Sequence, residues 1–132
     1  METLIFFIMI FCHIVDDYYL QGILAQMKQK SWWKEHAPDP MYQYDYVVAL
    51  IMHSFSWAFC IMLAPCIYSF HKLGGITSVY ILLFMINMCI HAYVDNIKAN
   101  KKEINLIIDQ TIHILQIMIT WMVYLSDICM YT

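Results

Sequence analysis

The sequence predicts an all-α protein, specifically a polytopic transmembrane four-helix bundle. Hydrophobic residues make up 62% of the 132 residues and charged residues only 13%, whereas roughly half of an average soluble domain is apolar. The apolar residues form runs of the length that a bilayer crossing requires, about 20 residues per helix. Polar stretches that contain proline, glycine or lysine separate these runs. One transmembrane domain over residues 1–132 therefore accounts for the whole chain.

The breaks between apolar runs predict the helix boundaries. We place the four spans at residues 4–25, 44–70, 76–97 and 104–125. The longest loop is residues 27–43, in which Pro38 and Pro40 exclude a continuous helix. The N-terminus has neither the basic region nor the small-residue cleavage site of a signal peptide, so we expect the first span to be retained.

The placement of lysines predicts the orientation. Six lysines flank the first and third loops, and only Lys72 lies on the other side; the six are Lys28, Lys30, Lys34, Lys98, Lys101 and Lys102. Because short basic loops are retained in the cytoplasm, we expect both termini outside a bacterial inner (cytoplasmic) membrane and the first and third loops inside. The lipid bilayer is then the main partner. Nucleic acid is excluded as a partner, because the net charge is −3 and arginine is absent.

Histidine and aspartate recur at one spacing in three of the four spans. The pairs are His13 with Asp17, His91 with Asp95 and, in reverse order, Asp109 with His113. Residues four apart lie on one face of a helix. Since the fourth span runs opposite to the first and third, each Asp lies about one turn, roughly 5.4 Å, nearer the cytoplasm than its His. His53 of the second span falls at the depth of the other histidines, so all four spans contribute to one layer.

Buried carboxylates are costly in a membrane, at about 2.5 to 3.5 kcal/mol for an Asp at a helix centre, and need a shared compensation. A divalent transition metal provides it, so we predict His13, Asp17, His53, His91, Asp95, Asp109 and His113 as metal ligands. Nitrogen and oxygen ligands favour Zn, Mn, Fe, Co or Ni, and seven exceed what one ion needs, so one or two ions are expected. The alternative is that these side chains form helix-to-helix hydrogen bonds that hold the bundle together.

Other polar residues continue the same helical stripes. Gln21, Asn87 and Gln116 lie three or four residues from a predicted ligand, where they could orient it. Lys98 follows Asp95 by three, and its amine could hold an anionic headgroup or serve only as an interfacial anchor. Asp16 stands beside Asp17, and the spacing from His13 favours Asp17 as the ligand.

The segments that begin at His13, His91 and Asp109, together with His53, resemble a family of small phage and bacterial membrane proteins, domain of unknown function 3307. That family has the patterns HxxxDFxxQ, a histidine in the second span, HxxxDxxK and DQxxH. All four occur here in order, except that Tyr18 replaces the phenylalanine. The resemblance implies the topology and a polar site but no established reaction.

The leading functional hypothesis is a membrane-embedded, metal-dependent hydrolase that acts near the cytoplasmic leaflet, with a lipid or isoprenoid phosphate as substrate. In it a metal activates water, Asp17, Asp95 or Asp109 accepts the proton, and Lys98 holds the anionic group. A second hypothesis is a metal-ion or proton carrier, for which four helices would require a homodimer. A third is a non-enzymatic phage membrane effector, in which the polar cluster only shapes the bundle.

Overall fold

The protein is all-helical over residues 2–131, the part of the chain that the computed structural model describes. The four long helices are α1 (Glu2–Val15), α4 (Asp45–Leu73), α5 (Ser78–Asn96) and α6 (Leu106–Cys129). Two π-helical segments extend them: η1 (Asp16–Leu20) follows α1, and η3 (Ile97–Lys101) follows α5. The first loop carries short helices, α2 (Leu24–Met27), α3 (Lys30–His36) and η2 (Pro40–Tyr42). These bounds confirm the all-α fold class. Four helical stretches are long and apolar enough to cross a membrane, at Glu2–Leu20, Pro40–Leu73, Ser78–Lys101 and Leu106–Cys129.

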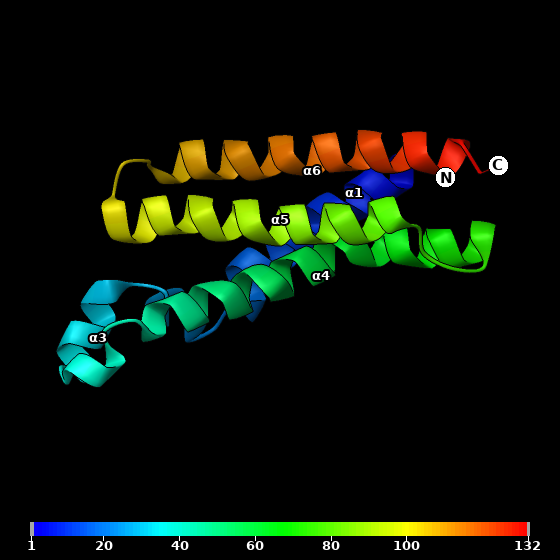
Figure 1. Ribbon diagram of the computed structural model, residues 1–132. Helices are drawn as coiled ribbons and strands as arrows, with labels where there is room; N and C mark the ends of the chain where they lie inside the picture. Colours follow the sequence, from blue (N-terminus) through cyan, green and yellow to red (C-terminus); the bar gives the residue numbers. More distant parts are fainter. Residues whose placement is uncertain (1, 132) are drawn as a thin grey trace.

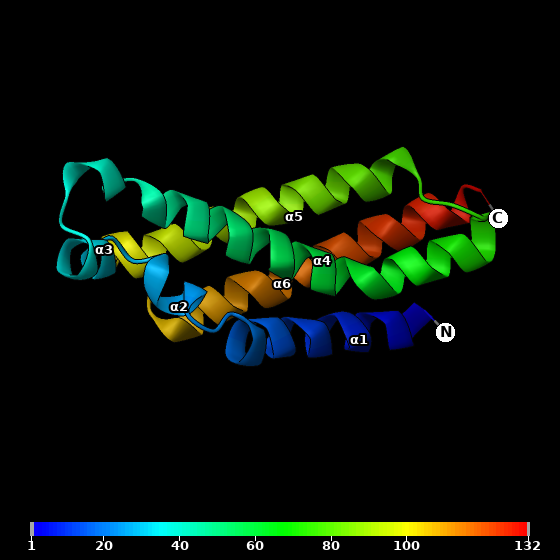
Figure 2. The same ribbon diagram turned by 90° about the horizontal axis from the view of Figure 1, so that it is seen from below.

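The long helices form a closed ring of neighbours (Figures 1 and 2). α1 packs against α4 and α6, and α5 packs against the same two helices from the other side. Both chain ends and the α4–α5 turn lie at one end of the bundle, while α3 and the α5–α6 turn lie at the other. We call the end that contains α3 and the α5–α6 turn the α3 end. It carries six of the seven lysines, including Lys28 and Lys98.

Local residue chemistry explains where most helices begin and end. The Thr77 side chain accepts the Tyr80 N–H at 3.1 Å and caps α5, and Asn105 does the same for Ile108 N–H at 2.9 Å at the start of α6. Gly74 ends α4 with a φ of 73°, which is easy only for glycine. Pro38 follows the end of α3 by two residues, as the sequence indicates.

The first span differs from its predicted extent. Residues 4–25 were expected to form one helix, but the helical stretch ends at Leu20. Gly22 has a φ of 49° and turns the chain there, so α2 is a separate short helix. The sequence feature that explains this turn is Gly22 itself, which tolerates a conformation that other residues disfavour. The turn brings Lys28 back against the end of the bundle.

Candidate metal centre

All seven predicted ligands are buried, and they meet at one level of the bundle. They come from all four long helices: His13 and Asp17 from α1 and η1, His53 from α4, His91 and Asp95 from α5, and Asp109 and His113 from α6. Their exposed fractions run from 0% for His53, His91, Asp109 and His113 to 9% for Asp17. The ionisable groups therefore lie in the interior of a bundle whose outer face is apolar, and they have one another as neighbours.

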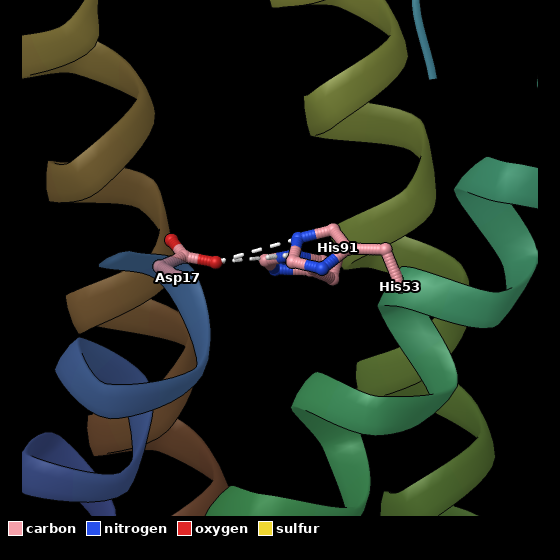
Figure 3. A group of neighbouring side chains, drawn as sticks. All are labelled: Asp17, His53 and His91. Atoms are coloured by element: carbon pink, nitrogen blue, oxygen red, sulfur yellow. Dashed lines mark hydrogen bonds and ion pairs between the residues drawn. The ribbon is translucent and has the colours of Figure 1, made fainter. Parts of the chain in front are cut away.

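Three of these residues have the spacing of ligands around one ion (Figure 3). His53 Nε2 lies 3.1 Å from His91 Nε2 and 3.4 Å from Asp17 Oδ1, and His91 Nε2 lies 3.7 Å from Asp17 Oδ1. Zinc binds such atoms at about 2.0–2.2 Å, so two ligands of a tetrahedral ion are about 3.3–3.6 Å apart. The three separations lie within about 0.2 Å of this range. Asp17, His53 and His91 thus form a candidate metal-binding group.

A second candidate group shares His91 and consists of His91, Asp95 and His113. His113 Nε2 lies 3.6 Å from Asp95 Oδ1, and the Nδ1 atoms of His91 and His113 are 3.3 Å apart. Asp95 also reaches toward the first group, since its Oδ2 lies 3.3 Å from His53 Nε2. The two groups are therefore parts of one cluster, and His91 is at its centre.

The charges of the cluster favour a divalent cation. Asp16, Asp17, Asp95 and Asp109 bring four buried carboxylates to this level. Two lysines neutralise two of them, since Lys28 Nζ lies 2.5 Å from Asp95 Oδ2 and Lys98 Nζ lies 2.6 Å from Asp109 Oδ2. With neutral imidazoles, two negative charges remain inside an apolar bundle, where an unpaired charge is expensive. One divalent ion would balance them.

Unsatisfied polar atoms face the same space. Asp17 Oδ1, Asp109 Oδ1 and His113 Nε2 are buried and have no hydrogen-bond partner among residues 2–131. Buried polar atoms are normally hydrogen-bonded, so three such acceptors in one cluster need a reason. Each is an atom of a type that binds metal ions. The donor set of imidazole nitrogens and carboxylate oxygens therefore fits a transition metal such as Zn, Mn, Fe, Co or Ni, without selecting among them.

His13 lies outside both groups, because its two ring nitrogens are already engaged. Trp57 Nε1 donates to His13 Nδ1 at 2.8 Å, which makes that nitrogen an acceptor. His13 Nε2 then donates to Gln110 Oε1 at 3.0 Å. Gln110 in turn donates to Asp17 Oδ2 at 3.2 Å and to Asp109 Oδ2 at 3.0 Å. His13 thus acts on the cluster through Gln110, by fixing the orientation of two carboxylates.

Asp109 also lies outside both groups and has a different neighbour. Its Oδ2 pairs with Lys98, while its Oδ1 lies 3.5 Å from His113 Nε2. Because Asp95 Oδ1 lies 3.6 Å from the same nitrogen, Asp109 borders the second group at His113 Nε2. Lys98, which we predicted to bind an anionic group, is one-third exposed and reaches the surface beside this pair.

The structure separates the roles of Asp16 and Asp17. The π-helical segment that begins at Asp16 turns both carboxylates inward; such segments are frequent at functional sites. Asp17 faces His53 Nε2, whereas Asp16 lies on the other side of that ring, 3.7 Å from Nδ1, and accepts from Ser56 Oγ at 2.6 Å. Asp17 is therefore the candidate ligand, and Asp16 supports His53.

The predicted orienting residues lie elsewhere. Gln21 donates to the backbone carbonyl of Asp17 rather than to its side chain. Gln116 and Thr120 each hydrogen-bond to Asn87, at 2.8–3.1 Å, and the three residues form a polar layer of their own.

Three contributors to the site were not expected from the sequence: Trp57, Lys28 and Gln110. Trp57 is fully buried and stacks on His91 with ring centroids 4.2 Å apart. Lys28 is 67 residues from Asp95 in the chain. In the sequence, Lys28 is a lysine just outside an apolar run, which is a common position, so nothing identified it as a partner of Asp95.

A pocket of about 350 Å³ adjoins the cluster at Asp95. Its polar lining consists of Gln21, Lys28, Gln29, Asp95, Lys98 and Lys102, and we call it the lysine pocket. Asp95 belongs to both the pocket and the cluster. The pocket therefore lies directly beside the buried groups.

Removal of the central histidine should abolish metal binding. We expect protein purified without a histidine tag and dialysed against Zn²⁺ or Mn²⁺ to retain about one ion per chain, and His91→Ala to retain less than about a tenth of that, because His91 belongs to both groups. Elemental analysis of the dialysed protein measures this. His36→Ala is the matched control, since His36 stacks on Trp32 outside the cluster. Equal metal content in all three proteins, with unchanged helicity, would refute the site.

Comparisons with models of protein families, with curated proteins and with solved structures found no match. The resemblance to domain of unknown function 3307, drawn from the His and Asp spacing, stays a prediction.

Proposed function

We propose that the protein is a membrane-embedded, metal-dependent hydrolase. The observation that carries the proposal is the group of Asp17, His53 and His91, which has ligand spacing, is buried between four apolar helices and adjoins a polar pocket through Asp95. Hydrolytic metal sites combine a few nitrogen and oxygen ligands with access for water and substrate. This cluster has such donors, and Asp95 connects it to a pocket.

The distribution of side chains supports a place in the bilayer. Large apolar residues point outward from every long helix, for example Phe7 at 62%, Phe11 at 64%, Ile67 at 65%, Leu82 at 57% and Ile107 at 76% exposure. The polar and ionisable groups are inside. A soluble protein would have the opposite arrangement, and exposed apolar surface of this extent marks contact with lipid or with partners.

The lysines support an orientation with the α3 end in the cytoplasm. Six of seven lysines flank the loops at that end, and Lys72 alone lies toward the other. By the positive-inside rule both termini then lie outside a bacterial inner membrane. The cluster and the lysine pocket would face the cytoplasmic leaflet.

Different residues around the cluster can perform different steps of hydrolysis. A divalent ion held by Asp17, His53 and His91 would polarise the scissile group and the attacking water. Asp95 borders both the cluster and the lysine pocket, so its carboxylate is positioned to accept the proton of that water. Water adds to the phosphorus or acyl carbon, the bond to the leaving oxygen breaks, and the proton passes from Asp95 to that oxygen.

A metal-ion or proton carrier is the second candidate, and the inner face of α6 favours it. Six buried polar residues follow this face from the cluster to the far end: Asp109, His113, Gln116, Thr120, Tyr124 and Asp127. Asp127 accepts from Thr77 at 2.5 Å, and Tyr124 bonds Ser69 at 2.9 Å. A carrier would use this line of groups, whereas a hydrolase needs only the cluster.

One pair of substitutions separates the two candidates. We expect Asp17→Asn to lower kcat at least about 100-fold toward a panel of phospholipid and isoprenoid phosphates with Zn²⁺ or Mn²⁺, because the carboxylate is a candidate ligand. Asp127→Asn changes an equally buried carboxylate at the far end, and we expect it to retain wild-type turnover. Loss of ion flux into proteoliposomes in both variants, without turnover in any protein, would favour the carrier. If removal of the whole cluster changes neither turnover nor ion flux, the cluster has only a structural role or belongs to a membrane effector.

The orientation predicts where each end of the chain can be labelled. In intact bacterial cells, we expect a periplasmic reporter to be active when fused at either terminus, and a cytoplasmic reporter to be active when fused within residues 37–39 of the first loop. Cytoplasmic activity of the terminal fusions would contradict the orientation.

A further inference from the structure

The lysine pocket is basic, although the chain as a whole is acidic. It contains the ammonium groups of Lys28, Lys98 and Lys102 against a single carboxylate, that of Asp95. Asp109 lies outside the lining but pairs with Lys98, so the pocket has an excess of one positive charge, whereas the whole chain carries −3. A concave site with excess positive charge concentrates anions.

The three lysines are not equivalent. Lys28 and Lys98 are held at the inner wall by Asp95 and Asp109, with side-chain exposures of 13% and 33%. Lys102 is exposed, and no ion pair engages it among residues 2–131. The pocket thus combines two ammonium groups anchored over the cluster with one that is free to bind an incoming group.

We propose that the lysine pocket binds the phosphate group of a ligand and holds it next to the metal cluster. A phosphate group has several acceptor oxygens, so it can bind more than one of the three ammonium groups at once. A carboxylate has two oxygens and offers fewer acceptors to these groups. This inference rests on the proposed hydrolase, for which it names the substrate class as phosphate esters.

The position of Asp95 links the pocket to the cluster. Its Oδ2 lies between Lys28 Nζ at 2.5 Å and His53 Nε2 at 3.3 Å. A phosphate that draws Lys28 toward itself frees this oxygen to face the cluster. Metal and phosphate should therefore strengthen each other's binding, as coupled ligands do.

A matched pair of lysines tests the pocket directly. Lys101 and Lys102 are neighbours, but Lys102 lines the pocket while Lys101 lies over the Tyr93 ring, 5.9 Å from its centroid. In a phosphorus NMR titration of the purified protein with inorganic phosphate, we expect Lys102→Gln to weaken binding about fivefold and Lys101→Gln to change it less than about twofold. Both variants remove one charge and retain a side chain of similar length.

The titration is run on Zn²⁺-loaded and metal-free protein whose metal content is measured. Phosphate binding that depends on Lys102 in both forms, and is tighter in the loaded one, supports the pocket. Binding that needs the ion and ignores Lys102 overturns it, while stoichiometric metal binding leaves the proposed hydrolase intact. Lys102-dependent phosphate binding by a protein that takes up no metal supports the pocket and removes the hydrolase.

A second arm identifies the source of the phosphate. The protein is placed in nanodiscs of phosphatidylcholine, with or without phosphatidic acid. If the wild-type protein and Lys101→Gln both lose inorganic phosphate binding in the phosphatidic acid discs, and added salt does not restore it, the pocket binds a lipid phosphate. Equal binding in both discs indicates a soluble phosphate ester. No phosphate binding in either disc overturns the proposal.

Discussion

The structure depends on how four buried carboxylates are neutralised between apolar helices. Asp16, Asp17, Asp95 and Asp109 are each at most 9% exposed, and a lone carboxylate in such surroundings costs several kcal/mol or more. Two ion pairs with lysines and a set of imidazoles offset part of this cost. A divalent cation at the cluster would offset the remainder. Without compensation these buried carboxylates destabilise the bundle, and carboxylates of this set belong to the candidate metal-binding groups.

The two sides of the cluster have different surroundings. Trp57 stacks on His91 and closes the side toward the hydrophobic core, which contains Met9, Ile61, Met62 and Ile117. On the opposite side the cluster adjoins the lysine pocket through Asp95. The cluster is thus covered by Trp57 on one side and adjoins a pocket at the α3 end on the other. An enzyme acting at one leaflet needs this asymmetry, whereas a carrier needs access from both ends.

Much of this site could be predicted from the sequence, because the i, i+4 spacing of His and Asp fixes a shared helical face. His13 and Asp17 share one face whatever the rest of the fold does, and alternating helix directions then bring the pairs to one depth. Side-chain partners distant in sequence could not be predicted. The Trp57 N–H that engages His13, and the Lys28 that reaches Asp95, depend on helix rotation and on the turn at Gly22. For this reason His13 was expected to be a ligand, while the structure gives it a supporting position through Gln110.

The central claim is that imidazoles and carboxylates of separate helices hold one cation inside the bundle. X-ray absorption spectroscopy of protein loaded with one equivalent of Zn²⁺ tests it most directly. The account predicts a shell of nitrogen and oxygen ligands at about 2.0–2.2 Å, with the outer-shell scattering of about two imidazoles. A sulfur shell at about 2.3 Å, or an oxygen shell without imidazole scattering, would contradict it.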